Sequence, residues 1–157
     1  SYGVFSQSSN VAPAVINTAY EVPLDTTNAG ETANIALSGT GAMTVGIAGR
    51  LKFSVTFNAL RLDGQFESKV YVWFRKNGTD IANSMQEYQM TDSIGNRTNV
   101  TGTQEYLINC VATDIITVAY AVDDNTTMVF VADAAQVSPY ARPSRSAFTV
   151  TVTPVGA

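Results

Sequence analysis

One segment constrains the fold of this chain more than any other. Residues 51–60 read Leu-Lys-Phe-Ser-Val-Thr-Phe-Asn-Ala-Leu, so apolar and polar side chains alternate through the segment. Because successive side chains of a β-strand point to opposite faces, this pattern predicts a strand with one buried and one wetter side. The same alternation recurs along the chain, and no helical pattern of similar length accompanies it. The sequence therefore predicts an all-β protein.

We expect about ten short antiparallel strands in a single domain that covers residues 1–157. Turn signals separate the strands about every 8–12 residues, a spacing typical of a sandwich or jelly roll. The expected strands cover residues 2–7, 18–24, 34–37, 43–47, 50–60, 68–76, 79–90, 103–112, 114–122, 127–132 and 146–155.

Between these strands the sequence carries turn and loop signals. Asn77-Gly78 is the clearest, because both central residues of a type I′ hairpin turn need positive φ. Residues 25–30 read as a turn, and residues 92–102, rich in Asn, Gly and Thr, read as a loop. Residues 136–145 contain two prolines and read as an extended connection.

Composition excludes several classes of function. The chain has 157 residues, a net charge of −4 and nine scattered basic residues, which argues against binding to nucleic acid. It has no histidine, so the usual general base and the commonest zinc ligand are missing. No apolar run reaches the roughly 18 residues that a membrane span needs, and no signal peptide is visible. We expect neither nucleic acid nor membrane as a partner.

Cys110 is the only cysteine, so the chain has no intrachain disulfide. Its apolar neighbours favour a buried, inert thiol over a reactive one. The sequence Asp123-Asp124-Asn125 offers oxygen ligands for calcium, or forms a solvated acidic turn. Glutamates 31, 67, 87 and 105 have no spacing that pairs two of them for glycoside hydrolysis. We therefore expect no enzyme activity, catalytic residue, cofactor or metal.

Five aromatic residues are candidates for a functional surface. Tyr71 and Trp73 alternate with buried positions of one expected strand and share their face with Arg75; the other three candidates are Tyr88, Tyr106 and Tyr120. Aromatic side chains stack on sugars, but they also dominate cores and subunit interfaces. The sequence alone leaves both interpretations open.

Two segments carry a resemblance to a known family. Residues 70–83 read Val-Tyr-Val-Trp-Phe-Arg-Lys-Asn-Gly-Thr-Asp-Ile-Ala-Asn, and residues 138–152 read Ser-Pro-Tyr-Ala-Arg-Pro-Ser-Arg-Ser-Ala-Phe-Thr-Val-Thr-Val. Together they resemble the tumour necrosis factor-like (complement globular-head-like) jelly rolls found in structural proteins of tailed bacteriophages. The resemblance covers the chain from about residue 50 to its end and, more faintly, residues 1–24.

This resemblance implies a ten-stranded jelly roll that forms a homotrimer, with no shared catalytic residue. In this jelly roll the last strand pairs inside a sheet. Phe148, Val150 and Val152 alternate with threonines in that strand, so we expect these three side chains toward the core. Arg142, in the Arg-Pro-Ser segment, either positions the connection against a neighbouring subunit or is solvated. The chain has neither the disulfide nor the collagen-like stem of the animal members, which argues against a signalling role.

We therefore expect a non-enzymatic virion structural protein of a tailed phage. The first hypothesis is a trimeric decoration or cement protein that binds the major capsid protein or other virion proteins. Such a protein is made in the host cytoplasm and resides on the virion surface. The alternative is the receptor-binding, carbohydrate-recognising head of a tail fibre, with a host surface glycan as its ligand. A fibre head usually needs a stem, and the printed chain contains none.

Overall fold

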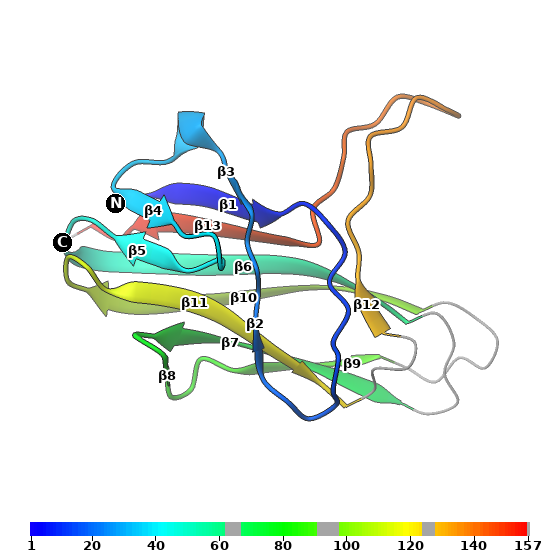
Figure 1. Cartoon of the computed structure of the whole chain (residues 1–157), viewed down its shortest axis with the longest axis horizontal. Coiled ribbons are helices and arrows are strands. Elements are labelled where there is room, and N and C mark those ends of the chain that lie inside the picture. The colour runs from blue at the N-terminus through cyan, green and yellow to red at the C-terminus, as the bar shows by residue number, and fades with distance from the viewer. Residues whose placement is uncertain (62–66, 91–97, 124–127, 157) are drawn as a thin grey trace.

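The computed structural model describes residues 1–61, 67–90, 98–123 and 128–156, which form two antiparallel sheets packed face to face (Figure 1). The six-stranded sheet contains β1 (Gly3–Gln7), β3 (Thr26–Thr27), β6 (Gly49–Arg61), β10 (Thr98–Cys110), β12 (Met128–Phe130) and β13 (Phe148–Pro154). The seven-stranded sheet contains β2 (Tyr20–Glu21), β4 (Ile35–Leu37), β5 (Met43–Val45), β7 (Ser68–Lys76), β8 (Thr79–Asp80), β9 (Gln86–Met90) and β11 (Ile115–Val122). A single 3₁₀ turn, η1 (Ala29–Glu31), is the helical part of these residues.

The strand order is that of a jelly-roll sandwich. One sheet runs β10-β6-β13-β1-β3, with β12 also on β6, and the other runs β4-β5-β11-β7-β8, with β2 on β11 and β9 on β7. The last strand, β13, lies between β1 and β6, and both neighbours run antiparallel to it. The expected all-β sandwich and the interior position of the last strand are therefore confirmed.

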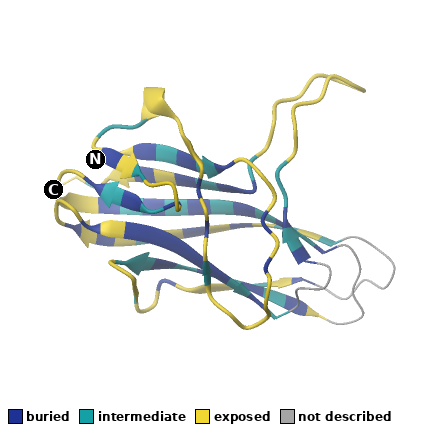
Figure 2. Ribbon diagram, in the orientation of Figure 1, coloured by how far each residue is buried: buried dark blue, intermediate teal, exposed yellow. Residues whose placement is uncertain are grey.

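A single aromatic-rich core lies between the sheets. The buried residues alternate with more exposed ones along the strands of both sheets (Figure 2). Phe57, Phe130 and Phe148 pack with ring centroids 4.7–6.2 Å apart. Val150 and Val152 join Phe148 on the inner face of β13, where each is almost fully buried, as expected. Full burial of such a side chain contributes about 1.5–3 kcal/mol. These three rings come from the six-stranded sheet, and they contact Tyr88 of β9 and Tyr120 of β11 in the other sheet, which joins the two sheets.

Three local expectations were wrong. Residues 98–102 are not a loop, because they pair with the last residues of β6 and so extend β10 to thirteen residues. In the expected strand at residues 18–24, only Tyr20–Glu21 form ladder pairs, just before Pro23, which has no N–H to donate. The expected turn at residues 25–30 contains the short strand β3 and enters η1.

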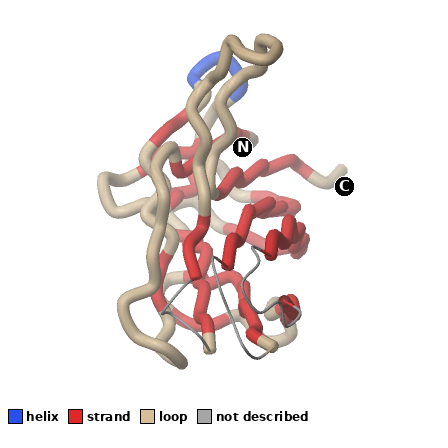
Figure 3. The backbone as a smooth tube through the Cα atoms, turned by 90° about the vertical axis from the view of Figure 1, so that its right-hand side faces the viewer, coloured by secondary structure: helices blue, strands red, loops and turns tan. Residues whose placement is uncertain are grey.

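The connection at residues 136–145 is also different from the expected one. Residues 133–145 form a narrow antiparallel arm that projects from the sandwich (Figure 3). The chain leaves β12, reaches the tip and returns to β13 along its own path, with backbone bridges between Asp133 and Arg145 and between Gln136 and Arg142. Extended backbone was expected here, but the pairing of the segment with itself was not.

At the opposite end of the sandwich, the Asn77-Gly78 hairpin is confirmed by positive φ values of 51° and 78°. The buried Asp114 carboxylate anchors this turn. Its Oδ1 accepts a hydrogen bond from Asn77 Nδ2 at 2.8 Å, and its Oδ2 accepts from Val111 N at 2.8 Å and pairs with Lys76 Nζ at 2.7 Å. These donors, led by Lys76, lower the pKa of Asp114 to about 2.

The lowered pKa predicts how stability depends on pH. Because the unfolded carboxyl has a pKa of about 3.9, Asp114 stabilises the fold fully above that pH and loses its contribution as the pH falls toward 2. Urea unfolding should find the Asp114→Asn variant less stable at pH 7, with the deficit shrinking between pH 5 and pH 2. Glu31→Gln, at an exposed position of η1, is the control. A deficit that stays constant over this range would contradict the assignment.

Side-chain hydrogen bonds close the edge of the sandwich where β9 and β10 meet. Gln104 Nε2 donates to the carbonyl of Ser84 at 2.6 Å, Tyr88 Oη donates to Thr103 O at 2.6 Å, and Tyr106 Oη donates to Ala82 O at 2.9 Å. Gln104 and Tyr106 belong to the six-stranded sheet, whereas Tyr88 reaches across from the seven-stranded sheet. Tyr88 therefore bonds one sheet to the other, whereas Gln104 and Tyr106 bond β10 to the connection between β8 and β9.

Gly102 makes this closure sterically possible. It lies in the middle of β10, and a Cβ at this position would stand 2.3 Å from Phe57 Cζ and 2.8 Å from Tyr88 Cε1. These two rings meet edge to face with centroids 4.8 Å apart. A larger residue at position 102 must therefore displace the contact that joins the two sheets.

We expect Gly102→Ala to destabilise the protein by about 1–3 kcal/mol, because overpacking forces both rings off their positions. Gly49→Ala is the matched control, since a Cβ at Gly49, also in a long strand, meets nothing within 4 Å. Chemical denaturation of both variants gives the two free energies of unfolding. Equal values would mean that the core around Phe57 repacks without cost.

Candidate interaction surfaces

The five candidate aromatic residues do not form one surface. Tyr120 lies in the core and is only 3% exposed, with its ring centroid 5.0 Å from Phe130 and 5.9 Å from Phe148. Burial raises the pKa of its hydroxyl to about 12. Tyr120 is thus unavailable for stacking on a ligand or for a subunit interface, and of the two interpretations it follows the one in which the aromatic side chain fills the core. Tyr120 stands an even number of residues from the buried Ile116, Val118 and Val122, so the alternation within this strand was the sequence signal for its burial.

Tyr88 and Tyr106 are half-buried at the closed edge of the sandwich. The Tyr88 hydroxyl donates to Thr103 O of β10 in the other sheet, and the Tyr106 hydroxyl donates to Ala82 O in the connection between β8 and β9. The Tyr88 ring packs edge to face against Phe57, and burial raises the pKa of its hydroxyl. The structure therefore gives these two residues a role in closing the sandwich.

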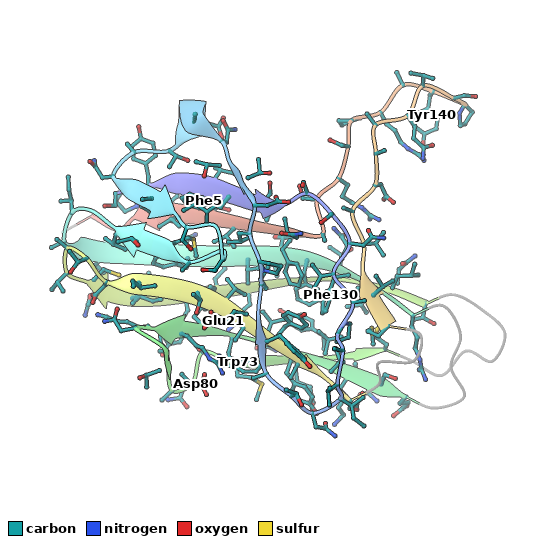
Figure 4. All side chains as sticks on the ribbon, viewed as in Figure 1. Phe5, Glu21, Trp73, Asp80, Phe130 and Tyr140 are labelled. Carbon is teal, nitrogen blue, oxygen red and sulfur yellow. The ribbon has the colours of Figure 1, made fainter. Side chains whose placement is uncertain are left out.

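Tyr71, Trp73 and Arg75 lie together on the outer face of β7, as expected. Trp73 Nε1 donates to Asp80 Oδ1 at 2.8 Å, and Arg75 Nε donates to the same oxygen at 2.6 Å (Figure 4). The Arg75 guanidinium also lies over the Trp73 ring, 5.8 Å from its centroid. The bond from Arg75 lowers the pKa of Asp80. The Arg75 guanidinium therefore already covers one face of the Trp73 ring.

The charged cluster extends to a strand distant in sequence. Glu21 of β2 accepts a hydrogen bond from Thr117 Oγ1 at 3.1 Å and pairs with Arg75 Nη1 at 3.6 Å. Lys69 and Glu87 form another ion pair on this side, at 3.0 Å. We call this surface the charged face: Glu21, Lys69, Tyr71, Trp73, Arg75, Asp80 and Glu87.

Sequence reasoning missed Asp80 and Glu21 as members of this cluster. The Asn77-Gly78 hairpin pairs Arg75 with Asp80, so the turn signal contained the information needed to find Asp80. No local signal points to Glu21, because its place depends on the pairing of β2 with β11.

The outer face of the six-stranded sheet has a different chemistry. One hydroxyl side chain from each of five adjacent strands falls in register across the sheet: Thr26, Ser6, Thr149, Thr56 and Thr103. The hydroxyls of Thr56 and Thr103 lie 3.2 Å apart. In the next row Val4, Thr151 and Ser54 are in register, and this row ends at the charged Glu105 of β10. The uncharged members of the two rows are therefore the five hydroxyl residues of the first row and these three. We call these eight residues the uncharged face.

Charged side chains border these eight residues on several sides, and Asp25 Oδ1 accepts a hydrogen bond from the Thr26 hydroxyl at 2.8 Å. Lys52 and Glu105 form an ion pair of 3.5 Å toward the termini. Arg145 lies at the other end, where its Nη1 is 3.4 Å from Asn58 Oδ1. The sequence pattern already indicated that these positions face outward, but only the register brings the hydroxyls into one row.

Arg142 lies on the projecting arm. Its Nη2 donates to Gln136 Oε1 at 2.7 Å, and its guanidinium lies 5.7 Å from the centroid of the Tyr140 ring. Both contacts stay within the arm. The structure therefore places Arg142 apart from the other candidate residues.

The remaining candidates give no further site among the described residues. Cys110 is buried, and burial raises the pKa of its thiol. Asp123 Oδ1 accepts a hydrogen bond from Lys69 N at 2.7 Å, whereas Asp124 and Asn125 lie outside the described residues. No three acidic or cysteine side chains in the described ranges converge on a metal-sized site. Nor do these ranges hold a helix of the length and apolarity needed to cross a bilayer.

Comparison with known proteins supports the fold. No protein-family model matches the chain, and a search of curated proteins finds no match. Among solved structures, the chain is similar to that of the Eiger tumour necrosis factor from S. frugiperda, with a TM-score of 0.57 and 13% sequence identity. The similarity covers 99% of this chain and 93% of the other. The chain therefore has a tumour necrosis factor-like jelly-roll fold.

Proposed function

We propose that this chain is a non-enzymatic structural protein of a tailed-phage virion, where it forms a homotrimer that decorates the capsid. The uncharged face is the observation that carries the proposal. The phage-like segments at residues 70–83 and 138–152, together with the tumour necrosis factor-like fold, add a family context in which threefold assembly is expected.

The two outer faces of the sandwich suit different surroundings. Interface cores are depleted in charged side chains, because burying an ion costs free energy unless it is paired. The uncharged face carries only small hydroxyl and aliphatic side chains, whereas the opposite face carries at least two groups of ion pairs. Short side chains on a regular sheet also allow close approach. The uncharged face is therefore the better candidate for the subunit interface.

This assignment predicts the effect of one added charge. Light scattering should give the wild-type protein a mass near three times the 16.7 kDa of the chain. Thr149→Glu, in the central row of the uncharged face, should shift the protein toward the monomer. Thr44→Glu is the matched control, at a half-buried threonine of β5 in the other sheet. A wild-type monomer at micromolar concentration, or a trimer unaffected by Thr149→Glu, would contradict the assignment.

The virion role needs a test on particles. Three copies in one trimer convert modest single contacts with a capsid lattice into tight attachment. Purified trimers should bind undecorated capsids and raise the resistance of these capsids to heat. High salt should weaken the binding only slightly, because a chain with few charges relies on apolar and hydrogen-bonded contacts. Co-sedimentation and thermal release of the packaged genome measure both effects.

The head of a tail fibre that recognises a host glycan is the second candidate. Tyr71 and Trp73 on the charged face favour it, because aromatic rings beside polar groups suit carbohydrate ligands. On this alternative the protein adsorbs to host cells and blocks infection, while capsids do not take it up. Cell-adsorption assays with the same preparation therefore separate the two roles.

A further inference from the structure

The arm at residues 133–145 has contacts of its own but little packing against the sandwich. Its two bridges join Asp133 to Arg145 and Gln136 to Arg142, with backbone N···O distances of 2.8–3.0 Å. Arg145 Nη2 also pairs with Asp133 Oδ2 at 2.6 Å. A two-stranded hairpin of this kind is marginal by itself. Its ordering costs conformational entropy that so few contacts offset only in part.

The tip of the arm is the most exposed apolar part of the described chain. Val137 is 87% exposed and Tyr140 is 63% exposed, and the two flank Pro139. The tip lies well away from both sheets, so no neighbouring element covers it (Figures 3 and 4). An exposed aromatic and aliphatic pair on a projecting arm is typical of a contact with another molecule.

The root of the arm borders the uncharged face. Asn58 of β6 joins the two, because its Nδ2 donates to Ser146 O at 3.0 Å while its Oδ1 accepts from Thr101 Oγ1 at 3.1 Å and from Arg145 Nη1 at 3.4 Å. A molecule packed on the uncharged face therefore meets the arm at its root.

We infer that the arm clasps a second copy of this chain, so that Val137 and Tyr140 are covered by a neighbouring subunit. The inference rests on the proposed trimer. From Asp133 to Tyr140 the arm can span about 23 Å, more than the ~19 Å across four strand spacings of a neighbouring sheet. The charges of the arm and of a second copy are complementary. The arm carries two arginines and one aspartate, whereas the whole chain is acidic, with a net charge of −4.

The first test measures trimer affinity with the full chain. Val137→Ser combined with Tyr140→Ser should raise the trimer dissociation constant at least tenfold while leaving the circular dichroism spectrum unchanged, because the arm is outside the core. Val111→Ser is the matched control: Val111 is 61% exposed at the turn between β10 and β11, at the opposite end of the sandwich (Figure 1). Sedimentation over a dilution series gives the constants.

The second test identifies what the tip contacts. Cys110 is buried, so Val137→Cys supplies one accessible thiol for a benzophenone photo-crosslinker. Covalent dimers and trimers of the chain from Val137→Cys, and none from Val111→Cys, support the inference. Monomer adducts alone from a protein that remains trimeric would overturn the inference and leave the proposed trimer intact. A monomeric wild-type protein would overturn both the inference and the proposed trimer. When undecorated capsids are included in the reaction, a cross-link to capsid protein in place of a second copy would also overturn the inference.

Discussion

Strand β6 is paired along both edges. β10 follows it for thirteen residues on one side, and β13 and β12 share the other side. Its inward side chains Phe53, Val55 and Phe57 are fully buried, and Phe57 contacts Tyr88 of the opposite sheet. The alternation in this strand thus sets the register of the six-stranded sheet, and a slip of one residue would turn the phenylalanines outward. The rows on the uncharged face depend on the same register.

Local signals in the sequence were enough to predict the sheet interior but not its periphery. Alternation identified Phe148 and Val150 as inward, and Asn77 needed only its own turn chemistry. Residues 98–102 form a strand only because β6 offers a partner, since their composition alone favours a loop. Likewise, Glu21 reaches Arg75 because β2 pairs with β11, which lies about one hundred residues later in the chain. A local sequence pattern cannot predict such a pairing.

The two outer faces divide the polar chemistry of the chain. Ion pairs gather over β7 and its neighbours, where Arg75 satisfies Asp80 and Glu21 together. Exposed pairs of this kind contribute little to stability, but they keep that face solvated. On the other face the hydroxyls of Thr56 and Thr103 contact each other, and the eight residues of the uncharged face carry no ion that must lose its hydration. Burying the uncharged face therefore costs much less free energy than burying the charged face.

The edges of the sandwich leave few routes for association through strand pairing. Short strands at an edge offer little template for another chain, and β3 and β4 have only two and three residues. At the other side, Gln104 and Tyr106 bond the long strand β10 to the connection between β8 and β9, which keeps its free edge turned toward β9. For the proposed trimer this leaves a sheet face and the projecting arm, where side chains rather than backbone groups make the contacts.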